Sequence, residues 1–137
     1  MLLSRNRLSV VLALAGLVLV AAALRAAAGT VPVQPVEIKY SRFEPNFLRL
    51  EAGKAVTFEI TNTDPIDHEF ILGDRQVQER HETGTEPHHG EIPTEVTVPA
   101  GQTVRTTVTF DRPGRLLMAC HLPGHYAYGM KAQVVVR

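Results

Sequence analysis

The sequence contains a single cysteine, no tryptophan and no run of basic residues. A single cysteine excludes an intramolecular disulfide, and it excludes a binuclear metal centre that needs two cysteine ligands. The missing basic run argues against a nucleic acid partner, because phosphate binding depends on clustered Lys and Arg. Since exported proteins usually pair their thiols, the lone Cys120 needs another reason to remain unpaired.

The first 28 residues have the composition of a targeting segment. Arg5 and Arg7 precede an apolar run of 17 residues, 8–24, and small residues follow it at 26–28. This order is typical of a secretory signal, and the run is slightly short for a bilayer span of about 20 residues. A cleaved signal peptide and a retained membrane anchor both stay open. In either case we expect residues 29–137 to be exported.

Residues 29–137 are enough for one modest hydrophobic core. Removing Arg5, Arg7 and Arg25 from the 14 basic and 14 acidic residues of the chain leaves 11 basic residues against 14 acidic ones. The sequence therefore predicts one weakly acidic domain at 29–137, preceded by a signal peptide or anchor helix at 1–28.

Short apolar stretches with a period of two predict an all-β domain. The clearest lie at 36–40, 56–60 and 104–110, where β-branched and aromatic residues alternate with polar ones. Shorter stretches occur at 47–50, 68–72, 96–98, 116–120 and 130–136. Separated by Gly/Pro turns, such strands are typical of an antiparallel sandwich or barrel.

Two segments depart from this strand pattern. Prolines at 32 and 35 predict that residues 30–37 form an extended lead-in to the first strand pattern. Residues 74–82 can form one or two helical turns capped by Asp74.

Cys120 opens the stretch CHLPGHYAYGM, in which a histidine and a methionine follow with the spacing C-x4-H-x4-M. A loop between two strands can bring Cys120, His125 and Met130 around one point. Thiolate, imidazole and thioether form a soft donor set that suits copper. A trigonal copper site needs a second imidazole from a distant strand, and His68, which opens a predicted strand, fits this role. Zinc also accepts a Cys/His2 set, but the methionine favours copper.

This layout resembles the cupredoxins, the small blue-copper proteins. The loop is similar to those of azurin and rusticyanin, which share C-x-x-P-G-H followed by a methionine, and to bacterial cupredoxin-domain proteins with HEF and CHxPGHY motifs. The resemblance implies a Greek-key β-sandwich of about 7–8 strands. It also implies one copper ion per chain in a mononuclear type 1 site. The equatorial ligands would be His68, Cys120 and His125, and Met130 would be the weak axial ligand.

The sequence departs from the better-known cupredoxins beside the first histidine. Those proteins commonly carry Asn after this ligand, whereas this chain has Glu69, with Asp67 on the other side. A carboxylate close to the metal would favour Cu(II) and lower the reduction potential, but both could also face solvent.

Four further histidines lie outside the predicted ligand set. His121 should point away from the metal because neighbouring residues of a strand face opposite sides, so we expect it to pack or to lie at the surface. His81, His88 and His89 stand among acidic residues. This segment could capture a second metal ion, but its spacing fixes no coordination geometry, and a solvated loop is the simpler interpretation.

No nucleophile–base pair stands out, and four protein ligands leave little room for substrate, so we expect no enzymatic activity. The favoured function is outer-sphere electron transfer through His125 to a redox partner such as a cytochrome or a copper oxidase. The alternative is an exported copper carrier or resistance protein that receives copper from a donor protein. We expect a monomer in the periplasm or on the outer face of the cytoplasmic membrane, with residues 8–24 as the potential attachment.

Overall fold

The computed structural model describes residues 29–84 and 92–137, and one compact unit runs from Val31 to Arg137. The predicted signal or anchor at 1–28 lies outside the described residues, as do His88 and His89. Within the described ranges, no helix is long and apolar enough to cross a membrane.

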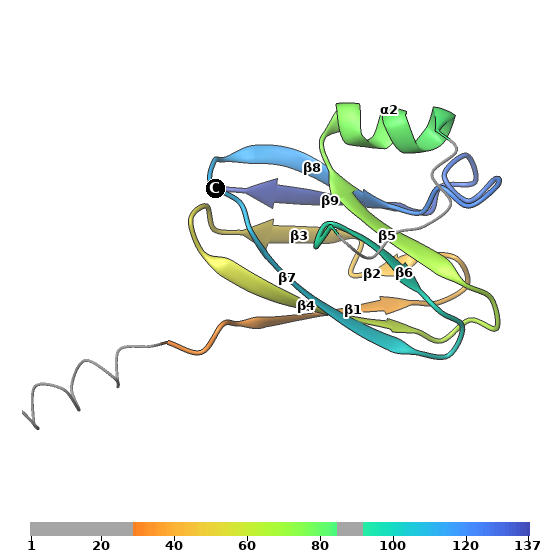
Figure 1. The fold of residues 1–137 in the computed structure, drawn as a ribbon, viewed down its shortest axis with the longest axis horizontal. Coiled ribbons are helices and arrows are strands. Elements are labelled where there is room, and N and C mark those ends of the chain that lie inside the picture. Colours follow the sequence, from red (N-terminus) through yellow and green to blue (C-terminus); the bar gives the residue numbers. More distant parts are fainter. Residues whose placement is uncertain (1–28, 85–91) are drawn as a thin grey trace, which may run out of the picture. The chain divides into compact units, whose positions relative to one another are not determined.

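The described residues form nine strands in two facing sheets (Figure 1). The first sheet has the order β2-β1-β4-β7, with β1 Val33–Ile38, β2 Phe43–Glu44, β4 Ala55–Asn62 and β7 Thr103–Thr109. The second has the order β3-β9-β8-β5-β6, with β3 Phe47–Leu50, β5 His68–Gly73, β6 Glu95–Val98, β8 Gly114–Ala119 and β9 Lys131–Val136. The predicted all-β sandwich is confirmed.

The sheets are mixed, whereas the alternation pattern led us to expect antiparallel pairing throughout. β1 pairs with β4 in parallel, and β3 pairs with β9 in parallel. A period of two fixes which side chains share a face but does not fix the direction of the neighbouring strand.

The lead-in predicted at 30–37 is extended, but β1 begins at Val33 rather than at the predicted Val36, so its second half belongs to the strand. Pro35 is tolerated within this strand because β2 pairs only with Glu37 and Ile38, so β1 has one neighbour at Pro35. Tyr40, expected at the end of the strand, lies beyond it with a positive φ of 53°.

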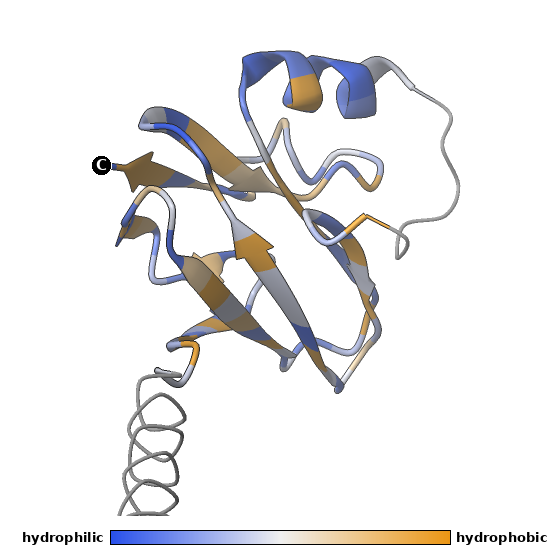
Figure 2. Ribbon diagram, turned by 60° about the vertical axis from the view of Figure 1, so that its left-hand side comes forward, coloured by the Kyte–Doolittle hydropathy of each residue, from blue (hydrophilic) through white to orange (hydrophobic). Residues whose placement is uncertain are grey.

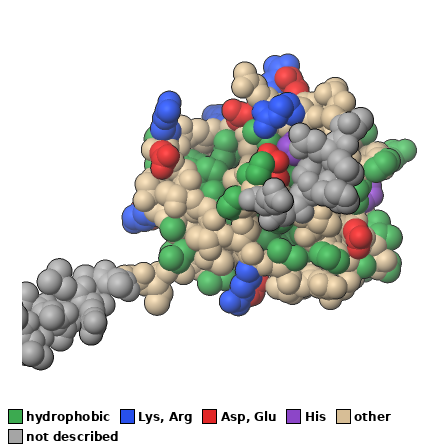
Figure 3. Space-filling model, in the orientation of Figure 1, with side chains coloured by type: hydrophobic (Ala, Val, Ile, Leu, Met, Phe, Trp, Pro, Cys, Tyr) green, Lys and Arg blue, Asp and Glu red, His purple; other side chains and the backbone are tan. Residues whose placement is uncertain are grey.

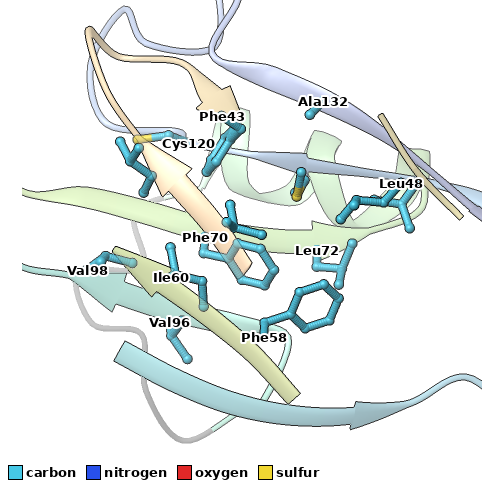
Figure 4. Packing of buried hydrophobic residues seen from close by; sticks show 14 of the residues in the cluster. Phe43, Leu48, Phe58, Ile60, Phe70, Leu72, Val96, Val98, Cys120 and Ala132 are labelled. Atoms are coloured by element: carbon cyan, nitrogen blue, oxygen red, sulfur yellow. The ribbon is translucent and has the colours of Figure 1, made fainter. Parts of the chain in front are cut away.

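Alternate residues of both sheets form a continuous core between them (Figure 4). The ring of Phe70 lies at its centre, with its centroid 5.2 Å from that of Phe58 and 6.4 Å from that of Phe43. Figure 2 shows the alternation that produces this core as hydrophobic and hydrophilic bands along the strands. Cys120 and Met130 belong to the same cluster, and Cys120 lies at its margin in Figure 4. The predicted metal site is therefore built on the end of the hydrophobic core.

The predicted helix is confirmed as α2, Arg75–Thr83. The Asp74 side chain accepts a hydrogen bond from the backbone N–H of Val77, as an N-cap does. The helix packs on β5 and β8, and only Gln78 is buried, in keeping with its largely hydrophilic colouring in Figure 2. A Cβ atom at position 73 would come within 2.5 Å of the Val77 side chain, so Gly73 permits the helix to lie this close to β5.

Candidate metal centre

The predicted donors come from two neighbouring strands and the loop that follows one of them. His68 is the first residue of β5, and Cys120 directly follows β8. These strands are antiparallel neighbours, with Ile71 opposite Ala119, so the start of β5 and the end of β8 meet at one edge of the sheet. His125 lies in the loop between β8 and β9, and Met130 directly precedes β9.

The structure brings the thiol and both imidazoles together. Cys120 Sγ lies 3.2 Å from His125 Nδ1 and 4.0 Å from His68 Nδ1. All three donor atoms lie within 4.8 Å of one another. Donors bound to one ion at about 2.0–2.3 Å have separations of this size. Within residues 29–84 and 92–137, no other three such donors gather as closely.

Backbone hydrogen bonds place Met130 beside the other two loop residues. The N–H of Cys120 donates to the carbonyl of Met130 at 3.2 Å, and the N–H of Met130 donates to the carbonyl of His125 at 2.9 Å. The Met130 side chain is fully buried and packs in the core cluster. The methionine is thus fixed at the base of the loop, next to the cysteine.

Asp64 orients the ring of His68. Its Oδ2 lies 2.9 Å from His68 Nε2, and its two carboxylate oxygens also accept hydrogen bonds from the N–H groups of Tyr40 and Ser41. A carboxylate on one ring nitrogen leaves the other nitrogen, Nδ1, as the metal donor. Burial tends to raise the pKa of Asp64, but the hydrogen bonds from Ser41, Tyr40 and His68 outweigh it and hold the pKa below its usual value.

Asn62 supports the bend that precedes His68. Its side-chain amide donates to the carbonyls of Ile66, Val98 and Pro99, and its Oδ1 accepts from the N–H of Asp64. The side chain is 1 % exposed. This buried amide ties the β4–β5 loop to the end of β6 and so holds Asp64 in place.

Glu69 connects the two ligand-bearing segments. Its backbone N–H donates to Cys120 Sγ at 3.4 Å, and its carboxylate accepts from the N–H of His121 at 3.0 Å. Asp67 instead accepts from the N–H of Ala100, at the turn between β6 and β7. Of the two carboxylates considered from the sequence, Glu69 is therefore the one joined to the cysteine segment.

The ring of His121 points away from the cluster and packs beneath α2. Its Nδ1 lies 2.8 Å from a carboxylate oxygen of Glu82, and its Nε2 lies 2.7 Å from the amide oxygen of Gln78. On its other side the ring stacks on Tyr126, with centroids 4.6 Å apart. The expected packing role is confirmed, and the contacts connect helix α2 directly to the residue after Cys120.

His81 lies in α2, where its Nδ1 is 2.8 Å from the carbonyl of Val77 and its Nε2 is 3.4 Å from Glu95 Oε2. Its ring is not part of the Cys120 cluster. The other two histidines of the suggested second metal site, His88 and His89, lie outside the described residues.

Burial sets the protonation of the donors. It raises the pKa of the Cys120 thiol to about 11, against the lowering effect of the Glu69 and Leu122 N–H groups. Burial also lowers the pKa of His125, and the neighbouring His68 acts in the same direction. At neutral pH the metal-free site therefore holds a neutral His125 ring and a protonated thiol, which must lose its proton to bind a metal.

The comparisons with known proteins agree with this site. Residues 10–136 match the family model of the cupredoxin-like domain. The chain belongs to this family. Among curated relatives, the copper-resistant cuproprotein CopI of Pseudomonas aeruginosa is 29% identical over 127 residues, which cover 69% of this chain and 70% of that protein. CopI of Rubrivivax gelatinosus is 35% identical over 100 residues, covering 70% of this chain and 60% of that protein.

Solved structures share the fold of this cupredoxin-like chain. Auracyanin B superposes with a TM-score of 0.66 at 22% identity, covering 80% of this chain and 93% of that one. A multicopper oxidase from Pseudomonas thermotolerans superposes with a TM-score of 0.56 at 18% identity, but only 30% of its chain is covered. At these identities the likeness establishes the fold alone.

The donor set fits copper, the cofactor expected from the sequence. A thiol and two imidazoles converge at the margin of a cupredoxin core, and the buried methionine is hydrogen-bonded through its backbone to the cysteine and to one histidine. Soft sulfur donors together with imidazole are the combination that selects copper. Copper as the cofactor is thus borne out by the family and by the chemistry of the cluster.

Three supporting residues were not anticipated from the sequence. Asp64, Asn62 and Gln78 contact a predicted ligand or its neighbour through side chains. Asp64 could have been suspected, because it precedes the predicted ligand by four residues and metal-bound histidines usually donate to a carboxylate. No signal in the sequence marks Gln78, which acts on His121 across 43 residues, or Asn62, which joins its own loop to the distant Val98 and Pro99.

Proposed function

We propose that this chain holds one copper ion in a type 1 site formed by His68, Cys120, His125 and Met130. The observation that carries the proposal is the convergence of the Cys120 thiol with Nδ1 of both histidines. The bound ion would supply one-electron chemistry between Cu(I) and Cu(II). The protein's part is to fix the His68 ring through Asp64 and the thiol through the Glu69 N–H before the metal arrives.

The visible spectrum of the purified chain with one equivalent of Cu(II) tests this assignment. An intense thiolate-to-copper band, bleached by ascorbate and restored by an oxidant, is expected. Cys120→Ser should abolish the band and His68→Gly should weaken or shift it. His81→Gln, which alters a histidine outside the cluster, should leave it unchanged. A weak spectrum in the native chain, or a Cys120→Ser variant that stays blue, would contradict the ligand set.

For the biological role we favour copper handling in an exported compartment. Two relatives that are 29% and 35% identical to this chain over the aligned residues are named copper-resistant cuproproteins. The apolar segment at 8–24 supports export to the periplasm or the outer face of the cytoplasmic membrane, with a copper-donor protein as partner. A closed site made of protein side chains suits binding rather than catalysis.

The copper-handling role can be tested in the native host. Deleting the gene should lower the copper concentration that stops growth, and the native gene should restore it while Cys120→Ser should not. If the deletion strain grows as well as its parent across the copper range, this role is wrong. Independently of the growth test, fractionation of the native cells should find the protein outside the cytoplasm.

Electron transfer is the second candidate function. His125 is only partly buried, whereas His68 and Cys120 are fully buried, so the electron would enter or leave by the His125 edge. The hydrogen-bonded ligands limit the rearrangement that accompanies a change of oxidation state. Fast electron exchange with a periplasmic cytochrome, measured by stopped flow, would favour this role. A copper stoichiometry above one per chain that falls to one when His81, His88 and His89 are replaced would favour sequestration.

A further inference from the structure

The outer face of the second sheet is only partly covered. Helix α2 packs over β5 and β8, and within residues 29–84 and 92–137 no other helix covers the outer faces of β8, β9 and β3. A hollow of about 490 Å³ lies between the helix and β8–β9, lined among others by Arg75, Leu117 and Gln133. A second hollow of about 470 Å³ lies against Phe47 and Lys131 and shares Leu117 and Gln133 with the first. We call this continuous depression the α2 groove.

The strand register fixes the composition of the groove floor. Val135 pairs with Arg49 on one side and Arg115 on the other. In the next outward-facing row, Gln133 pairs with Phe47 and Leu117. The floor therefore combines apolar side chains with arginines that stand at its edge, since residues two apart on a strand share one face.

Three cations lie in or beside the groove: Arg115 and Lys131 line the hollows, and Arg49 stands over the ring of Phe47 at the edge. In the described part of the chain, Arg49, Arg115 and Lys131 have no acidic partner, whereas Arg75 pairs with Glu79. Arg49 and Lys131 lie instead over the aromatic rings of Phe47 and Tyr126. Figure 3 shows basic side chains along the upper rim, where α2 and β8 lie in this view, with acidic side chains among them. Because residues 29–137 carry 11 basic and 14 acidic residues, this face is positive on a domain that is negative as a whole.

The groove is also connected to the metal centre through one aromatic residue. Tyr126 lines the larger hollow, its ring lies 4.5 Å from Lys131 Nζ, and it stacks on His121. His121 directly follows Cys120. A partner seated in the groove would therefore contact a residue packed against the neighbour of the predicted thiolate ligand.

We propose that the α2 groove is the docking surface for an acidic segment of a partner protein, in which Asp or Glu side chains flank an apolar one. Arg115 and Lys131 in the hollows and Arg49 beside them, which have no acidic partner among the described residues, supply charge complementarity, and Leu117 and Phe47 supply the apolar contact. Two connected hollows suit a protruding segment better than the flat surface of a lipid bilayer. The proposal depends on this face alone and stands whether or not the copper assignment does.

Amide chemical shifts of the purified chain in its reduced, diamagnetic state provide the test. The probe is a short synthetic peptide in which Glu and Asp flank leucines, compared with the same peptide carrying Lys in place of the acidic residues. The acidic peptide should shift the amides of Leu117, Tyr126 and Gln133, with an affinity that falls as salt is added. The double variant Arg49→Glu/Arg115→Glu should weaken binding about tenfold.

The single variant Arg115→Glu, which alters a residue lining the larger hollow, is compared with Arg112→Glu, which makes the same charge change at an exposed position that lines neither hollow. Arg112→Glu should change the affinity less than about twofold. Because the side chains of Arg49 and Arg115 are exposed, the double variant should fold, and unchanged shifts elsewhere would establish that it does. Equal binding of the Lys peptide, or native affinity in the double variant, would overturn the proposal. So would phosphatidylglycerol vesicles that shift these amides when the peptide does not.

Discussion

Asp64 Oδ2 lies 2.9 Å from Nε2 of His68, on the side of the ring opposite the nitrogen that faces Cys120. The carboxylate therefore selects which nitrogen is available to the metal. It is itself held by the N–H groups of Tyr40 and Ser41, so that the β1–β2 turn supports a ligand on the other sheet.

Replacing this carboxylate should weaken the metal site without removing a ligand. Asp64→Asn keeps the size of the side chain but loses the charge that stabilises the oriented ring, so copper affinity should fall about 10–100-fold. Competition with a Cu(I) chelator measures it. Asp67→Asn is the matched control, because Asp67 bonds to Ala100 and should leave the affinity within about threefold. Equal losses in both variants would show that Asp64 has no special role.

Copper affinity should rise with pH. The pKa of the Cys120 thiol is raised to about 11, and the pKa of His125 is lowered, so at pH 7–9 the metal displaces a proton from the thiol but none from His125. Each unit of pH below the thiol pKa should then change the affinity by about tenfold, and the dependence should level off above it.

Calorimetry in buffers of different ionisation enthalpy can count the protons released on binding. Loss of the thiol proton in Cys120→Ser should reduce the count by about one relative to the native chain. An unchanged count would mean that the thiol does not bind as thiolate.

Glu69 should lower the reduction potential of the site. Its carboxylate bonds to the N–H of His121, next to the cysteine, and its charge raises the pKa values of Cys120 and His125. Removing the negative charge disfavours Cu(II), so Glu69→Gln should raise the potential by about 50 mV. Voltammetry of both forms measures the change, and Asp67→Asn should shift the potential less. A fall in potential would contradict this electrostatic account.

Gln78 should contribute more to the free energy of unfolding than polar helix residues usually do. Its buried amide donates to the carbonyls of Ile71 and Leu117, and its oxygen faces His121. Gln78→Leu would leave these groups without partners, and the free energy of unfolding of the metal-free chain should fall by about 3 kcal/mol. Urea denaturation measures this value. Gln76→Leu, an exposed change on the same helix, should cost under about 0.5 kcal/mol.

The sequence predicted best those features that depend on the spacing of residues close together in the chain. Alternation predicted the strands that contribute the core, such as β4 and β7, and Asp74 marked the start of α2. The spacing of Cys120, His125 and Met130 identified a loop whose donor atoms the fold then brought to His68. These features depend on neighbours within a few residues.

What the sequence did not predict depends on segments that meet only in the folded chain. Asp64 acts with Tyr40 and Ser41, which lie more than 20 residues before it, and Gln78 acts on His121 across 43 residues. The parallel pairing of β1 with β4 is likewise a choice of partner that alternation cannot encode. The carboxylate of Glu69 could have faced solvent or the site, and only the position of His121 decides between them.

The separation of His68 from Cys120 along the chain has a consequence for when the ion can be acquired and lost. Along the chain, β6 and β7 lie between these two residues, so the donors are far apart in a partly synthesised or unfolded polypeptide. Only the docking of β8 against β5 assembles them. The complete metal site would therefore form late in folding. Any process that separates β8 from β5, including proteolytic degradation, would release the bound ion in one step.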